Sequence, residues 1–120
     1  MLRVHTRNLG DAAVLSLQGR LISGETRALR EAIRAQSNAK AIILDLGRVT
    51  AIDAYGLGLM LELRHLSDTK GVRFKLMNVS KFTSRVFEVT RLDSVFELIP
   101  KAEPSVAHTI AARAPVAACA

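Results

Sequence analysis

The hydrophobic and polar positions of this chain alternate between a spacing typical of strands and one typical of helices. Leucine- and valine-rich runs at residues 2–6 and 13–19 are separated by turn-forming residues, which predicts an opening β-hairpin. Residues 40–46 form a continuous apolar run, as expected for a strand covered on both faces in the middle of a sheet. The alternation at residues 72–79 and the short run at 94–99 predict two further strands.

Apolar residues at helical spacing predict helices between these strands. The first predicted helix spans residues 25–36, and its apolar face comprises Ala28, Leu29, Ala32 and Ile33. The second spans residues 54–71 and ends in a cation and a glycine, which helix C-termini favour. The third spans residues 80–92, begins at a serine able to cap it, and has Phe82, Val86, Phe87 and Val89 at near-helical spacing.

The alternation of strands and helices after the hairpin predicts an α/β fold, in which a mixed β-sheet has helices packed on it. A length of 120 residues suits one domain with a single core, and we expect it to span residues 1–113. Pro104 is expected to begin a short last helix at 104–113, since proline is tolerated in a first helical turn. Residues 114–120 are expected to form a frayed C-terminal tail.

The helix predicted at 54–71 has a wider apolar arc than one contact with a sheet requires. Projection at 100° per residue places one stripe toward the sheet, formed by Leu59, Met60, Leu63 and Leu66. Leu57 and Leu61 fall outside this stripe, on the side of Arg64. Either the helix at 80–92 covers these two leucines, or they form an exposed apolar patch rimmed by charge, a composition typical of protein-docking surfaces.

Composition indicates a globular protein with 49% hydrophobic and 23% charged residues. The longest apolar run is far shorter than the ~20 residues of a membrane-spanning helix, and the N-terminus lacks the apolar stretch of a signal peptide, so we expect a cytoplasmic protein. The net charge of +6 favours an acidic partner. Nucleic acid is not the expected partner, because the chain has no tryptophan and only five other aromatic residues to stack on bases.

The sequence offers little catalytic chemistry. Cys119 has no partner for a disulfide, and the three histidines, His5, His65 and His108, lack metal-ligand spacing, so no metal or cofactor is expected. The two glycines near residue 57 follow a strand but lack the third glycine of a dinucleotide fingerprint and the lysine of a phosphate loop. Neither a nucleophile elbow nor a zinc helix is present in the sequence. We therefore expect the protein not to be an enzyme.

Asp53 stands immediately before the helix predicted at 54–71. Its carboxylate could act as a general base, although no nucleophile or second acid is close to it in sequence. The stronger interpretation is a helix cap, in which the aspartate accepts backbone N–H bonds and complements the helix dipole.

Residues 41–61 and 74–98 together resemble the STAS domain, a family named for sulfate transporters and anti-sigma factor antagonists. The most specific part of the resemblance is the strand, the turn at Asp53 and the Gly-Leu-Gly sequence at the start of the helix. The resemblance covers nearly the whole chain and implies a STAS-like mixed sheet. In the bacterial antagonists of this family, a serine or threonine follows the aspartate and is phosphorylated by a kinase that is also the anti-sigma factor.

Asp53 and Gly56 match the family pattern, but Ala54 occupies the phosphoacceptor position and cannot be phosphorylated. Tyr55 and Thr50 are poor substitutes, one being aromatic with a distant hydroxyl and the other lying on the strand side of the turn. The resemblance implies partner-switching control of transcription by a protein held in its binding-competent form, or one whose control has moved to another subunit. The expected partner-binding residues are Asp53, Ala54, Tyr55, Gly56, Leu57, Leu61 and Arg64. The alternative role is an accessory subunit of a membrane transport ATPase complex.

Overall fold

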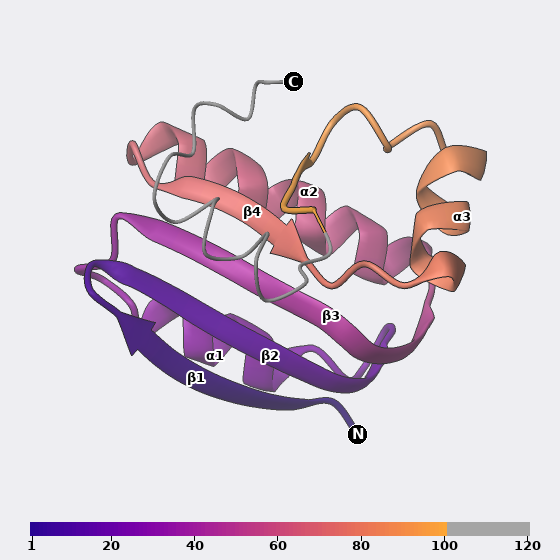
Figure 1. Cartoon of the computed structure of the whole chain (residues 1–120). Helices are drawn as coiled ribbons and strands as arrows, with labels where there is room; N and C mark the ends of the chain where they lie inside the picture. Colours follow the sequence, from indigo (N-terminus) through magenta and orange to yellow (C-terminus); the bar gives the residue numbers. More distant parts are fainter. Residues whose placement is uncertain (101–120) are drawn as a thin grey trace.

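Five strands form one sheet in the order β1-β2-β3-β4-β5 (Figure 1). The structure is a computed structural model and describes residues 1–100. The first two strands pair antiparallel as the predicted hairpin, and every later pair of neighbours is parallel. The α/β fold with a mixed sheet is therefore confirmed. The strands are β1 Arg3–Leu9, β2 Ala12–Leu21, β3 Ala41–Ile52, β4 Arg73–Met77 and β5 Glu97–Leu98.

Each parallel pair of strands is connected through a helix, as parallel connections require. The helices are α1 Arg27–Arg34, α2 Ala54–Thr69 and α3 Lys81–Val89. Figure 1 shows α1 and α2 behind the sheet, with α3 at the end where β3 and β4 finish. The helix predicted at 104–113, the domain end at 113 and the frayed tail at 114–120 lie outside the described residues.

The middle of the sheet is β3, as the apolar run at 40–46 predicts. Its side chains alternate in burial: Ile42 and Leu44 are buried against the helices, whereas Ile43 is only half-buried. Full coverage of both faces, which the run of apolar residues suggested, is therefore not what the structure shows. β3 also extends well beyond the apolar run, and this extension brings the chain to Asp53 at the start of α2.

The buried face of α2 differs at one position from the predicted stripe. Leu59, Met60 and Leu63 are buried, but Leu66 is 45% exposed and Ser67 is buried in its place. Leu66 lines an open groove between α1 and α2, because α1 is short and does not cover it. On α1, Leu29 is fully buried whereas Ala28 is exposed, so its contact with the core is narrower than predicted.

The helix α3 packs on the core through a single aromatic side chain. Phe87 is 1% exposed and lies beside Phe96, with ring centroids 5.4 Å apart. Phe82 and Val89, expected on the same apolar face, are exposed instead, since the buried face of this nine-residue helix consists of Thr83 and Phe87, one turn apart. Ser80 caps the helix as predicted, its side chain accepting a hydrogen bond from the backbone N–H of Thr83.

Candidate functional site

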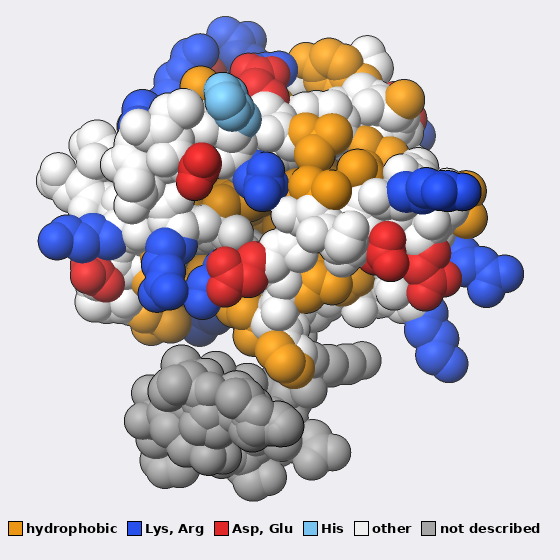
Figure 2. Space-filling view, turned by 90° about the horizontal axis from the view of Figure 1, so that it is seen from above, with side chains coloured by type: hydrophobic (Ala, Val, Ile, Leu, Met, Phe, Trp, Pro, Cys, Tyr) orange, Lys and Arg blue, Asp and Glu red, His pale blue; other side chains and the backbone are white. Residues whose placement is uncertain are grey.

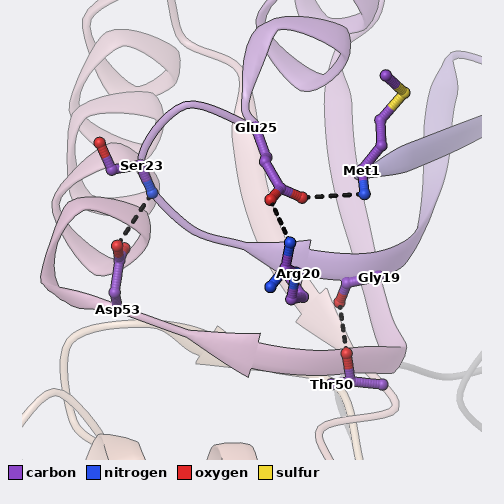
Figure 3. Close-up of polar contacts among 7 residues, drawn as sticks. All are labelled: Met1, Gly19, Arg20, Ser23, Glu25, Thr50 and Asp53. Atoms are coloured by element: carbon purple, nitrogen blue, oxygen red, sulfur yellow. Dashed lines mark hydrogen bonds and ion pairs between the residues drawn. The ribbon is translucent and has the colours of Figure 1, made fainter.

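Asp53 joins two segments that are far apart in sequence. One carboxylate oxygen accepts the backbone N–H of Gly56 at 2.8 Å, which caps α2, and the other accepts the backbone N–H of Ser23 at 3.0 Å (Figure 3). The predicted cap is thus confirmed, and the bond to Ser23 ties the loop after β2 to the start of α2. We call Ser23 and residues 53–56 the α2 corner.

The backbone of β2 approaches the start of α2 very closely. A Cβ atom added at Gly56 would lie 2.0 Å from the carbonyl oxygen of Leu21, so only glycine fits there. The N–H of Asp53 also points at this carbonyl, with 3.4 Å between nitrogen and oxygen. Glycine at this position therefore has a steric function, and the structure explains the first glycine of the pair without a phosphate ligand.

Both hydrogen bonds to Asp53 favour the charged form of its side chain. The N–H of Ser23, followed by that of Gly56, holds the pKa of Asp53 below its usual value. A lowered pKa in the folded state means that ionised Asp53 contributes to stability above the pKa of the unfolded chain. This contribution is lost as the pH falls through the lower, folded-state pKa.

The substitution Asp53→Asn tests this linkage. Asparagine retains one oxygen to accept the Gly56 N–H, but its NH2 group would face the backbone N–H of Ser23, which needs an acceptor. We therefore expect a less stable protein at neutral pH. The difference between wild type and variant should shrink in acid, as Asp53 becomes protonated. Urea denaturation midpoints measured across the acid range check this, and a difference that does not change with pH would contradict the role of the charge.

Tyr55 is held in place by a side chain from α1. The guanidinium of Arg30 donates to the Tyr55 hydroxyl at 3.0 Å and lies 3.5 Å from the carboxylate of Glu62. The hydrogen bond from Arg30 is the main reason that the pKa of Tyr55 is lowered. The ring is nevertheless 44% exposed, so Tyr55 is oriented by α1 without closing the corner from solvent.

The remaining predicted site residues lie along α2. Ala54 is exposed at the first position of the helix, and Leu57 and Leu61 are half-buried at the margin of the core. The two leucines are therefore neither sealed inside nor fully exposed. We call Ala54, Tyr55, Leu57 and Leu61 the candidate docking surface. Arg64 is exposed one turn further along α2 from Leu61, where it lines a hollow with residues of the β4 and β5 region.

The face of the molecule that presents α2 is mixed in character (Figure 2). Hydrophobic side chains gather on the half nearer α3, among separate acidic and basic groups. Apolar surface rimmed by charge is the usual composition of a surface that docks another protein.

Ser23 and Arg30 are the residues of this site that sequence reasoning missed. Each contacts the α2 corner from more than 20 positions away along the chain, Ser23 through Asp53 and Arg30 through Tyr55. No local pattern signals such contacts. Within residues 1–100, no group of three or more histidine, cysteine, aspartate or glutamate side chains could hold a metal ion, and no helix there is long and apolar enough to span a membrane.

Comparison with solved structures places the fold among known proteins. An anti-sigma factor antagonist from Mycobacterium paratuberculosis is 24% identical with a TM-score of 0.71, and the match covers 92% of this chain and 95% of that one. SpoIIAA of Bacillus in its phosphorylated form is 20% identical with a TM-score of 0.65, covering 90% and 99%. A sulfate transporter family protein from Wolinella succinogenes is 17% identical with a TM-score of 0.70, covering 85% and 87%.

The sequence itself matches the model of a protein family. The match to the STAS domain extends over residues 3–108 and thus includes the sheet and the three helices described within residues 1–100, together with the α2 corner. With this match and the shared fold, the chain belongs to the STAS domain family.

Proposed function

We propose that this protein is a non-enzymatic interaction domain that acts as an anti-sigma factor antagonist in partner-switching control of transcription. Its partner in this role is an anti-sigma factor kinase, or a similar protein with an ATPase domain. The partner docks on the candidate docking surface, and position 54 is not phosphorylated, because alanine has no hydroxyl to accept the phosphate.

The observation that supports this proposal most is the construction of the α2 corner. Asp53 fixes the helix start through Gly56 and the neighbouring loop through Ser23, so Ala54 is exposed on a rigid support. A small side chain on a fixed backbone allows close approach by a partner, and little conformational entropy is lost when they bind. The half-buried Leu57 and Leu61 supply apolar area next to it.

A second candidate function is an accessory subunit of a membrane transport ATPase complex. The similarity in fold to the sulfate transporter family protein from Wolinella succinogenes favours this role. A subunit that binds an ATPase without being phosphorylated would have no need of a hydroxyl at position 54. The same docking surface would then bind a transporter component.

Affinity capture from an extract of the cells that make the protein distinguishes the two functions. The immobilised full chain is expected to retain a protein with a kinase-type ATPase domain, which mass spectrometry identifies. A column bearing the Ala54→Glu variant is the matched control and should retain far less of it. Recovery of transport ATPase subunits in place of the kinase would overturn the first function in favour of the second.

A further inference from the structure

Four hydroxyl groups lie at or next to the α2 corner, and three of them are occupied or inaccessible. Thr26 is buried, Thr50 donates to a backbone carbonyl of β2 at 3.2 Å, and Tyr55 accepts from the guanidinium on α1. Ser23 differs from these three, because it is exposed and its hydroxyl has no hydrogen-bond partner among residues 1–100. Figure 3 shows its backbone N–H directed at Asp53 and its hydroxyl directed away.

Ser23 occupies the tip of a tight turn. The N–H of Glu25 donates to the carbonyl of Ile22 at 3.1 Å, which closes the turn around Ser23 and Gly24. Gly24 has a φ of +84°, as the third position of a type II turn requires, and a Cβ atom there would meet nothing within 4 Å. The tip is therefore open to solvent, while its base is fixed to the protein.

We propose that Ser23 is the phosphoacceptor of this protein, in the place of the hydroxyl that position 54 lacks. This inference rests on the proposed function, in which the partner is a kinase that uses ATP. The Ser23 Oγ attacks the γ-phosphorus of ATP, a new bond forms between that oxygen and phosphorus, and the bond from the γ-phosphorus to the bridging oxygen breaks. ADP leaves, and the hydroxyl proton passes to a base of the kinase or to water.

The position of Ser23 gives such a phosphate an effect on docking. A phosphate on Ser23 would add about −1.5 to −2 charges. The backbone N–H of Ser23 is hydrogen-bonded to the carboxylate of Asp53, and Asp53 directly precedes Ala54. The phosphate would project into solvent from the exposed tip of the turn, on the side of Ser23 that faces away from the Asp53 carboxylate. An acidic partner, which the chain's charge of +6 favours, would be repelled at the same place. Phosphorylation of Ser23 would therefore release the partner without any change at position 54.

Phosphate transfer to the full chain tests the proposal. The chain is incubated with radiolabelled ATP in an extract of the cells that make it, and the labelled residue is located by mass spectrometry. We expect one labelled site in the wild type, loss of nearly all label in Ser23→Ala, and unchanged label in Ser37→Ala. Ser37 is the matched control, since it is an exposed serine in the loop at the other end of α1.

Binding provides the second measurement. Ser23→Glu is expected to bind the captured partner at least about tenfold more weakly than wild type, whereas Ser23→Ala should bind as wild type does. Absence of label in the wild type, or equal label in Ser23→Ala, would overturn the assignment of Ser23. If the wild type still captured an ATPase-domain protein, that result would leave the proposed function standing. Failure to capture such a protein would instead count against the proposed function.

Discussion

Replacing Gly56 with alanine is expected to destabilise the native state strongly. The new methyl group would lie 2.0 Å from the backbone carbonyl oxygen of Leu21, and neither backbone segment can retreat without separating α2 from β2. Overpacking typically costs about 1–3 kcal/mol, and we expect the upper end of this range here because the clash is with backbone; this is a large part of the ~5–15 kcal/mol that stabilises a typical domain. Urea denaturation followed by circular dichroism measures the loss.

Gly58 provides the matched control for this substitution. It lies two residues further along the same helix, it is exposed, and a Cβ atom there would meet nothing within 4 Å. Gly58→Ala is expected to stabilise the protein by about 0.5–1 kcal/mol, because alanine loses less backbone entropy in a helix. If Gly56→Ala and Gly58→Ala changed the stability of the protein by similar amounts, close packing of α2 on β2 would not require glycine at position 56.

Substituting glutamate for Ala54 is expected to abolish most of the partner binding. A carboxylate at the first position of α2 would be buried unpaired in the complex and would repel an acidic partner. The cost is about 3 kcal/mol, which weakens binding about a hundredfold in a titration. The fold should tolerate the change, since Ala54 is exposed and a negative charge is favourable at a helix N-terminus.

Two variants control for the position and the size of the new side chain. Ala54→Ser adds only a hydroxyl and should bind as wild type does. Leu66→Glu places the same charge on an exposed side chain toward the other end of α2, and it should leave binding unchanged. If Leu66→Glu reduced binding as strongly as Ala54→Glu, the partner would dock along the α1–α2 groove rather than on the candidate docking surface.

Much of the fold could be predicted because the deciding interactions are local. The turn after Leu9, the apolar run at 40–46 and the serine cap of α3 each depend on neighbouring residues. Asp53 belongs to the same class, since its bond to Gly56 spans three positions of one helix start. These features were confirmed because local chemistry and tertiary packing favour the same structure here.

Other features depend on how separate elements meet, and periodicity could not predict them. Leu66 is exposed because α1 ends before covering it, and the residue pattern of α2 does not reveal the length of α1. Phe82 and Val89 are exposed because α3 is anchored mainly through Phe87. The contact of Ser23 with Asp53 follows from the parallel pairing of β2 with β3, which places the ends of both strands side by side. The sequence therefore predicted the cap formed by Asp53 and Gly56, but not the contact between Asp53 and Ser23.

Isothermal titration of the captured ATPase-domain partner into the wild-type chain and its Ala54→Glu variant measures the role of the α2 corner most directly. We expect the wild type to bind, and we expect glutamate at position 54 to weaken binding about a hundredfold while the thermal unfolding of the free chain stays unchanged. Equal affinity of the wild type and the variant for the partner would place the docking surface elsewhere on the molecule.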